Sequence, residues 1–392
     1  MDPMAGENPF RYGDIVSGTQ FTDRRDEIAA LRADVESGQN VVVIAPRRTG
    51  KSSLMRAAVE ELRAAGVLVA ECDLFAAPDK GRLVEQLTTA LYRGLLSPFE
   101  RAGRRSLDFL RRMPVGPVAT VDPEDGSLSF TMPQTLRRGD VDVTLERLLR
   151  LPAEVAAERG RRVALVLDEF QEVTRIDRDL PRVMRAVFQQ QPEVAHVYLG
   201  SHRHMLRRLF TERNEPLFRS AKVMELGPIP AADFGPFVAE RFAETGRSIT
   251  PEAVERLLEI TAGQPYDTQE LARFLWAISA DRPATPDMVD EAFGHAVMAE
   301  SARCATIWEG LSPYQRLVLL AVAQEAGRIY SEEYRHRHRL GPPARVQKAV
   351  EALADRDLVE GATRPGYTVP DPFLRAWLSG RVRTPPAPVS FG

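Results

Sequence analysis

The chain has 392 residues, more than one ordinary domain, so two or three domains are expected. Hydrophobic residues make up 44% of it and charged residues 27%, proportions that are typical of a soluble globular protein. A formal net charge of -3 gives no overall attraction to nucleic acid, so any basic surface must be local.

The two cysteines favour a reducing compartment. Cys72 and Cys304 stand alone, without the spacing of a disulfide framework or a metal site. No secretory signal pattern precedes Asn8, and no apolar stretch approaches the roughly 20 residues that a membrane helix needs. We therefore expect a cytoplasmic protein with no membrane partner.

A helix is the first predicted element. Ile28, Leu31 and Val35 recur at the spacing of one buried helix face. Thr22 or Asp23 is the expected N-cap, because short polar side chains accept hydrogen bonds from the first helical N–H groups.

A P-loop follows the first predicted strand. The β-branched run Val41–Ile44 leads into Ala45-Pro46-Arg47-Arg48-Thr49-Gly50-Lys51-Ser52 and then into a helix-forming stretch, a context that disfavours a chance match. Gly50 permits the backbone angles that turn N–H groups toward a phosphate, Lys51 would neutralise the β and γ oxygens, and the Ser52 hydroxyl would coordinate Mg²⁺. The residues expected to bind the nucleotide are Pro46, Arg47, Arg48, Thr49, Gly50, Lys51, Ser52 and Ser53.

Strands and helices alternate after the P-loop, which predicts a parallel sheet. Short alternating stretches around 113–133 indicate an inserted β-hairpin of open role. The expected strands are 67–70, 163–167, 194–199 and 222–226, and the expected helices are 81–96, 141–158 and 180–190.

Two adjacent acids end the most apolar of these strands. Val163–Leu167 runs directly into Asp168 and Glu169, and strand ends are where α/β sheets carry chemistry. Asp168 would hold Mg²⁺ through its water shell, and Glu169 would orient and deprotonate the water that attacks the γ-phosphate. The alternative is an ordinary solvated loop after a core strand.

The C-terminal region has the pattern of a winged helix. Helices over 312–325, 331–338 and 342–355 precede a predicted β-wing and a closing helix. Exposed Arg345, Gln347 and Lys348, with the basic run 335–339, would form a phosphate-binding face, although several acids dilute it. Winged helices also serve as protein contacts, so double-stranded DNA and a protein partner both stay open. The proline-rich residues 381–392 are expected to be a flexible tail.

These motifs together resemble the archaeal-type ATPase family, a branch of the signal-transduction P-loop ATPases (STAND) related to AAA+ proteins and origin-recognition initiators. The resemblance covers nearly the whole chain. Its carrying segments are Asn8-Pro9-Phe10, Phe21–Glu27, Pro46–Ser53, Leu167–Gln171, Leu199–Ser201, Gly263–Pro265 and Asp371–Leu378.

The resemblance implies three further roles. Ser201 or His202 would sense the γ-phosphate, although Ser201 would equally suit the N-cap of the next helix. Arg219 would stabilise charge on the γ-phosphate in cis or from a neighbouring subunit, unless it is one more surface arginine. Gly263 and Pro265 would form a lid motif over the base and sugar, and a helix C-cap with a turn would explain them too.

The sequence therefore predicts an α/β P-loop NTPase, AAA+/STAND-like, with a helical lid and a C-terminal winged helix. The expected bounds are 1–227 for the ATPase core, 228–308 for the lid and 309–380 for the winged helix. The expected function is an Mg²⁺-dependent ATP-hydrolysing switch, acting on a separately encoded protein or as a homo-oligomer. The alternative is an ATP-licensed DNA-binding protein.

Overall fold

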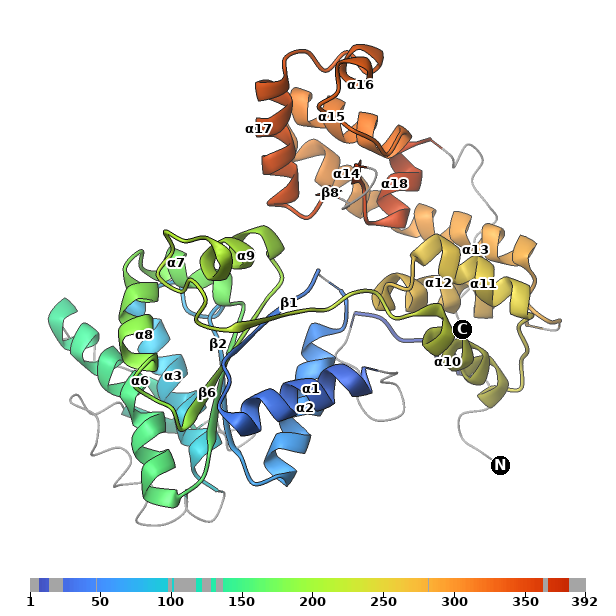
Figure 1. The fold of residues 1–392 in the computed structure, drawn as a ribbon. Coiled ribbons are helices and arrows are strands. Elements are labelled where there is room, and N and C mark those ends of the chain that lie inside the picture. Colours follow the sequence, from blue (N-terminus) through green and yellow to red (C-terminus); the bar gives the residue numbers. More distant parts are fainter. Residues whose placement is uncertain are drawn as a thin grey trace. The chain divides into compact units, whose positions relative to one another are not determined.

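The computed structural model describes residues 7–13, 24–46, 48–97, 101, 118–121, 128–131, 137–280, 282–361 and 366–380. Compact packing divides the chain into two units (Figure 1). The first consists of residues 24–46 and 51–226, and the second of residues 1–23, 47–50 and 227–392. The P-loop thus crosses the division, since its residues 47–50 group with the C-terminal half.

A parallel sheet forms the centre of the first unit, as predicted. Its strand order is β2-β5-β6-β1-β7. All pairings within it are parallel, so the carboxyl ends of the strands share one edge. The strands are β1 Val41–Ile44, β2 Leu68–Asp73, β5 Val163–Asp168, β6 Val194–Gly200 and β7 Lys222–Glu225.

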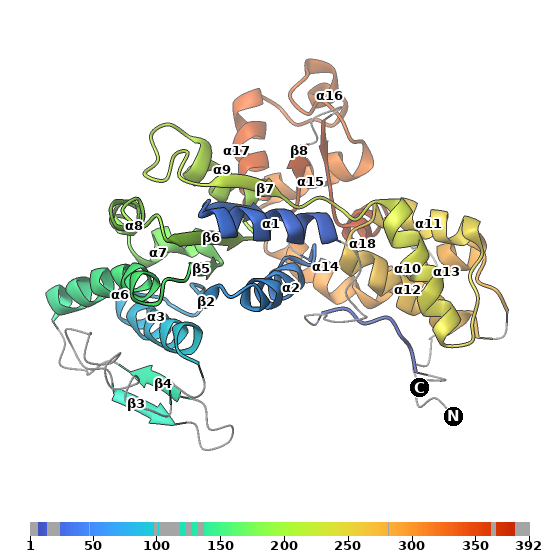
Figure 2. The same ribbon diagram turned by 60° about the horizontal axis from the view of Figure 1, so that its bottom comes forward.

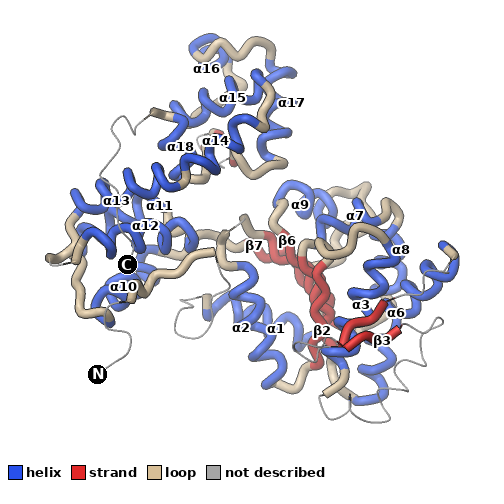
Figure 3. The backbone as a smooth tube through the Cα atoms, turned by 180° about the vertical axis from the view of Figure 1, so that it is seen from behind, coloured by secondary structure: helices blue, strands red, loops and turns tan. Residues whose placement is uncertain are grey.

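Helices cover both faces of this sheet, which explains the continuous apolar character of β1 and β6. Figure 3 shows α1 and α2 on one side and α3, α6 and α8 on the other. Their bounds are α1 Arg25–Ser37, α2 Lys51–Ala64, α3 Lys80–Leu95, α6 Arg138–Arg159, α7 Val173–Ile176, α8 Leu180–Phe188 and α9 Arg203–Thr211.

One strand is longer than predicted. The sequence prediction ended the second strand at Ala70, whereas β2 continues to Asp73, which lies beside Asp168 in the register. Glu71 and Asp73 hid this extension, because charged residues are unusual in a sheet interior. β2 is an edge strand, and both side chains are exposed.

The predicted hairpin is present beside α3. β3 (Val118–Val121) and β4 (Leu128–Thr131) pair antiparallel, and Figure 2 shows them apart from the main sheet. Phe130 is buried, with its ring centroid 5.0 Å from that of Tyr92 on α3. An aromatic edge contact therefore holds the hairpin on the helix.

The second unit begins with a helical lid. Its helices are α10 Ala231–Glu244, α11 Pro251–Thr261, α12 Pro265–Ile278 and α13 Pro286–Ala299. Phe10 is fully buried in this core, 5.3 Å from the Phe242 ring. Asn8 donates a hydrogen bond to the backbone oxygen of Arg273, so the N-terminal segment belongs to the lid.

The predicted winged helix follows. Ser312, Ser331 and Asp371 cap the starts of three of its helices with side-chain hydrogen bonds. The elements are α14 Ser301–Glu309, α15 Pro313–Gln324, α16 Glu332–Arg337, α17 Pro343–Ala354, β8 Glu360–Gly361, β9 Tyr367–Thr368 and α18 Pro372–Leu378. The expected caps Thr22 and Asp23 and the expected tail 381–392 lie outside the described residues.

Across the described ranges, every helix is too short or too polar to cross a lipid bilayer.

Candidate active site

Lys51 brings the P-loop and the acidic strand end together. It begins α2 and is only 8% exposed. Its Nζ donates hydrogen bonds of 2.8 Å to Oδ1 of Asp168 and to Oε1 of Glu169. The three residues for which the sequence predicted phosphate, metal and water chemistry thus form one connected group.

Glu169 has an unusual backbone. Its φ is +47°, in the left-handed region, which costs a non-glycine residue about 1 kcal/mol. Its N–H donates to Asp168 Oδ1 at 2.7 Å, which helps to fix this turn. Its carboxylate accepts from Lys51 on Oε1, and from Ser201 Oγ at 3.1 Å and Gln171 Nε2 on Oε2. Three donors therefore surround the proposed base.

These donors control the ionisation of Glu169. Burial opposes ionisation, but the hydrogen bonds from Lys51, Gln171 and Ser201, with the Lys51 charge, outweigh it and lower the pKa of Glu169. The side chain is therefore a carboxylate at neutral pH, the form that can accept a proton from water.

Asp73 is a third acid at this edge that the sequence prediction missed. It lies beside Asp168 in the sheet register, and its Oδ1 accepts the Phe75 N–H at 2.9 Å. Loss of hydration raises the pKa of Asp73, and the neighbouring charges of Asp168 and Glu169 raise it further. Once β2 is known to extend to residue 73, its pairing with β5 predicts that Asp73 lies next to Asp168.

Ser201 points at Glu169 rather than capping a helix. It is buried at the end of β6, and its hydroxyl donates to Glu169 Oε2. Helix α9 starts at Arg203 with His202 as its N-cap residue, so the alternative that Ser201 caps this helix is wrong. The Glu169 bond ties Ser201 to the acidic strand end.

The P-loop residues differ in backbone conformation and in exposure. Gly50 has a φ of +80°, the conformation for which the sequence supplies glycine. Thr49 and Ser53 are buried, Pro46 is half-buried, and the Ser52 side chain is exposed directly after Lys51. Arg47 lies outside the described residues.

Ser52 and Asp168 offer the donor set of a magnesium site. A hydroxyl and a carboxylate are hard oxygen donors, and Mg²⁺ combines one or two such groups with phosphate oxygens and water. The Lys51–Asp168 bond connects these two donors through the residue next to Ser52. The residues present therefore fit this ion.

Within the second unit, Arg48 connects the P-loop to the lid. Its guanidinium carbon lies 4.1 Å from the centre of the Tyr266 ring, and the Tyr266 N–H donates to the Arg48 oxygen at 3.3 Å. Tyr12 meets the same ring edge-on at 5.3 Å. Two aromatic rings and a cation thus gather at the start of α12.

The local backbone structure also explains why residue 263 is a glycine and residue 265 a proline. Gly263 has a φ of +69°, and a Cβ there would lie 2.3 Å from the backbone oxygen of Ile229. Pro265 occupies the first turn of α12, where its missing N–H costs nothing. The turn that precedes the lid helix therefore depends on both residues.

Two acids that the sequence analysis did not single out lie on α12. Asp267 and Glu270 are buried, and burial raises the pKa of Asp267 to about 7 and that of Glu270 to about 8. The negative charge of Glu300 raises both pKa values further, and that of Asp371 adds to the rise for Asp267. One oxygen of Glu270 has no hydrogen-bond partner among the described residues, as suits a group held neutral.

Two arginines, Arg48 and Arg303, act on Asp267 and Glu270 through their positive charges. The charges of Arg48 and Arg303 both lower the pKa values of the two acids, but less than burial raises them. Arg303 on α14 is itself engaged, because it pairs with Glu300 and, at 2.8 Å, with Asp371 at the start of α18. The cluster therefore joins the lid to the winged helix.

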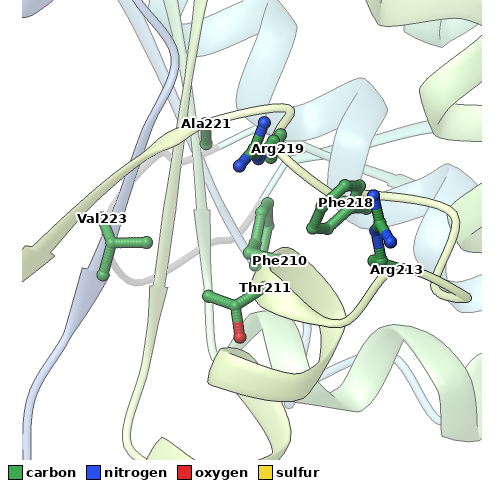
Figure 4. Close-up of a pocket in the computed structure, with 7 residues that line it drawn as sticks. All are labelled: Phe210, Thr211, Arg213, Phe218, Arg219, Ala221 and Val223. Carbon is green, nitrogen blue, oxygen red and sulfur yellow. The ribbon is translucent and has the colours of Figure 1, made fainter.

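Arg219 lies at a surface pocket and not in the Lys51 group (Figure 4). It has a φ of +54°, and its guanidinium carbon is 5.3 Å from the Phe218 ring centre. Among the described residues it forms no ion pair, in contrast to Arg207 and Arg208, which pair with glutamates. The pocket is lined by Phe210, Thr211, Arg213, Phe218, Arg219, Ala221 and Val223.

The basic residues of the winged helix divide into two sets. Arg335 donates to two backbone carbonyl groups, and Arg337 pairs with two glutamates at 2.6 Å each. Arg345, Gln347 and Lys348 on α17 are exposed, and the Arg345 guanidinium covers a tyrosine ring at 4.0 Å. The charge of Arg337 is therefore neutralised within the domain, whereas the three polar side chains on α17 stay exposed.

Two regions of the chain match known families. Residues 20–199 match the family described as AAA ATPase domain, and residues 303–380 match the one described as probable winged helix domain. No curated protein shows significant similarity to this chain.

Solved structures share the architecture. The Walker-type ATPase PABY2304 of Pyrococcus abyssi has a TM-score of 0.66 at 18% identity, over 93% of this chain and 99% of that one. The ORC2 protein of Aeropyrum pernix, in its ADPNP–ADP complexes, has a TM-score of 0.56 at 15% identity, over 96% and 97%. At these identities the likeness is one of fold, and it confirms the predicted architecture. The match of residues 20–199 to the AAA ATPase domain supports the predicted resemblance.

Proposed function

We propose that this chain, whose residues 20–199 match the AAA ATPase domain, is a molecular switch in which Mg²⁺-dependent binding and hydrolysis of ATP set the state of the winged helix. The observation that carries this proposal is the hydrogen-bonded group of Lys51, Asp168 and Glu169 at the end of the P-loop. It combines a cation for phosphate, a carboxylate for a metal and an ionised base for water.

Each residue of this group would act on a different part of the reaction. Lys51 binds the β and γ oxygens of ATP, which compete for its ammonium group with the two carboxylates that it now contacts. Ser52 and Asp168 hold Mg²⁺, which when bound neutralises charge on the phosphates. Glu169 orients the attacking water and accepts its proton.

Other predicted residues would complete the nucleotide site. Ser201, already within 3.1 Å of Glu169, would exchange that bond for one to the γ-phosphate. Arg219 forms no ion pair with the described residues, and it would stabilise γ-phosphate charge in cis or in a neighbouring subunit of a homo-oligomer. Gly263 and Pro265 would shape the lid turn over base and sugar.

The second unit supplies a physical connection from the P-loop to the output. Arg48 contacts Tyr266 at the start of α12. Asp267 and Glu270, on the same helix, feel the charge of Arg303. Arg303 in turn pairs with Asp371, the N-cap residue of α18. A nucleotide shifts this unit only if ATP and ADP interact differently with its two states. The Arg48 segment is where such a difference would enter.

We propose residues 1–227, 228–308 and 309–380 as the bounds of the ATPase core, the lid and the winged helix.

A turnover assay tests this proposal. ATP hydrolysis by the wild type and by Glu169→Gln would be measured with and without double-stranded DNA, at two salt concentrations. We expect slow turnover in the wild type, indifferent to DNA, and almost none in the variant. A cytoplasmic switch of this kind awaits a separately encoded protein partner.

DNA binding is the second candidate function. Exposed Arg345, Gln347 and Lys348 on α17 favour it, because cations on a winged-helix surface attract phosphates. In this case DNA would stimulate turnover, affinity would fall steeply with salt, and replacing Arg345 and Lys348 would weaken binding. The internal pairing of Arg337 leads us to rank this function second.

A further inference from the structure

Gln171 contacts the proposed base from inside the protein. It is 2% exposed, two residues after Glu169, and its Nε2 donates to Glu169 Oε2. The amide must face Glu169 with its nitrogen, because a carboxylate accepts hydrogen bonds and repels the amide oxygen. The other end, Oε1, is buried without a hydrogen-bond partner among the described residues. The amide therefore faces Glu169 at the cost of an unsatisfied oxygen.

Gly200 leaves the space that this amide occupies. A Cβ at residue 200 would lie 2.2 Å from Gln171 Oε1 and 2.6 Å from Cδ1 of Leu206. The backbone of Gly200 is not in the left-handed region, so space alone demands a glycine here. Both crowded atoms are ends of flexible side chains. An alanine would therefore displace the Gln171 amide without straining the strand.

The other two donors to Glu169 are those that a nucleotide would draw away. Lys51 holds Oε1 and would turn to the phosphates, and Ser201 shares Oε2 and would turn to the γ-phosphate. The buried Gln171 has no such competing ligand. A carboxylate rotates easily about its last torsion, so without a fixed donor it would lose its orientation when the others leave.

We propose that Gln171 is the positioning residue of the hydrolysis reaction: it fixes Oε2 of Glu169, so that Oε1, released by Lys51, faces the attacking water. The inference rests on the proposed role of Glu169 as the base. Gln171 itself does not touch the nucleotide. It sets the direction of the base and, as a hydrogen-bond donor, favours its ionised form.

Replacing Gln171 by leucine tests this role. The change keeps the volume close and removes both the donor and the unsatisfied oxygen, so the protein should fold and bind a fluorescent ATP analogue as the wild type does. We expect kcat to fall roughly 10- to 100-fold with KM unchanged, as is typical when a supporting hydrogen bond is lost. A lowered kcat at an unchanged KM separates a misplaced base from a general loss of the binding site.

Gly200→Ala provides a second variant that leaves Gln171 in place. It should lower kcat in the same way, with KM unchanged. Gln191→Leu is the matched control, because Gln191 is also buried and also donates through Nε2, in this case to the backbone oxygen of Leu149. Its Oε1 likewise has no hydrogen-bond partner among the described residues. This control should keep the wild-type kcat.

The outcomes separate this inference from the proposed function. If Gln171→Leu and Gly200→Ala keep kcat within about twofold, while Glu169→Gln is inactive, then Glu169 is the base and the role of Gln171 is overturned. If Glu169→Gln hydrolyses ATP at the wild-type rate, the proposed function falls and the inference falls with it. A lowered kcat in Gln171→Leu with an unchanged KM supports both.

Discussion

One acid at the strand end and two acids in the lid helix differ in the direction of their pKa shifts, although all three lie near arginine or lysine. Glu169, beside Asp168, has a lowered pKa, whereas Asp267 and Glu270 have raised pKa values. Glu169 accepts three hydrogen bonds directly, one of them from Lys51. One oxygen of Glu270 has no hydrogen-bond partner among the described residues.

The difference shows that a nearby cation is insufficient to keep a buried acid charged. Direct hydrogen bonds stabilise the charged form at short range, and without them the cost of dehydration wins. The strand end thus holds a base that is charged at neutral pH, and the lid helix holds a pair of acids whose charge changes with pH. Four changes would break or sharpen this contrast.

Glu169→Gln should have the largest effect. The amide cannot accept the proton of the attacking water, so kcat should fall roughly 10²- to 10⁴-fold while ATP still binds. A coupled assay for released phosphate measures this, with nucleotide titration alongside. Glu71→Gln, which changes an exposed glutamate paired with Arg63, should retain wild-type turnover. Turnover in Glu169→Gln within tenfold of the wild type would contradict the role of the base.

Lys51→Ala should weaken ATP binding about 10- to 100-fold, because a charge-assisted contact to the phosphates is lost. It also removes the cation that lowers the pKa of Glu169, so any remaining activity should require higher pH. Isothermal titration with ATP checks the affinity. Lys80→Ala is the control, since Lys80 pairs with Asp142 and Asp177 on the surface. Equal affinity in the wild type and Lys51→Ala would rule out this contact.

Arg303→Met should destabilise the second unit. It leaves Glu300 and Asp371 without their shared cation and removes a positive charge from Asp267 and Glu270. We expect Tm to fall by about 2 to 6 °C at pH 8, and by less at pH 6, where the two buried acids are protonated. Differential scanning fluorimetry measures both. Arg256→Met, at an exposed pair on the lid surface, should change Tm less, and an equal drop would refute the argument from burial.

Glu270→Gln should have the smallest effect and the clearest sign. Since the pKa of Glu270 rises from 4.5 to about 8 on folding, the folded state holds the extra proton and stability is lost as pH increases through that interval. The variant lacks this loss, so its Tm at pH 9 should exceed that of the wild type by about 2 to 4 °C and match it near pH 5. Glu259→Gln, at an exposed position, should follow the wild type.

The sequence predicted the residues whose chemistry is local. Lys51, Asp168 and Glu169 follow from the loop after one apolar strand and the acids after another, and the parallel sheet brings the two strand ends to one edge. The alternating elements and the winged helix followed from periodicity and capping residues in the same way. The local sequence pattern was sufficient to predict a residue's role or an element's type wherever that role or type depends on one element and its immediate neighbours in the chain.

Residues that depend on neighbours distant in the chain were not predicted. Asp73 required the true end of β2, and the shifts of Asp267 and Glu270 depend on charges that lie far along the chain, such as Glu300 and Arg303. Gln171 was part of a recognised motif, but its role needs the left-handed turn at Glu169 and the space beside Gly200. No periodicity encodes such contacts.

The edge strand β7 has a consequence for solubility. It forms one of the two edges of the sheet in the described part of the chain, and Val223 is exposed there, so N–H and C=O groups on its outer side could pair with a strand of another chain. Both ends of the strand carry charge, with Lys222 bound to Asp34 and Glu225 to Arg207. An incoming strand would have to break or bury these ion pairs. The short, charged edge therefore protects the ATPase from aggregation through its own sheet.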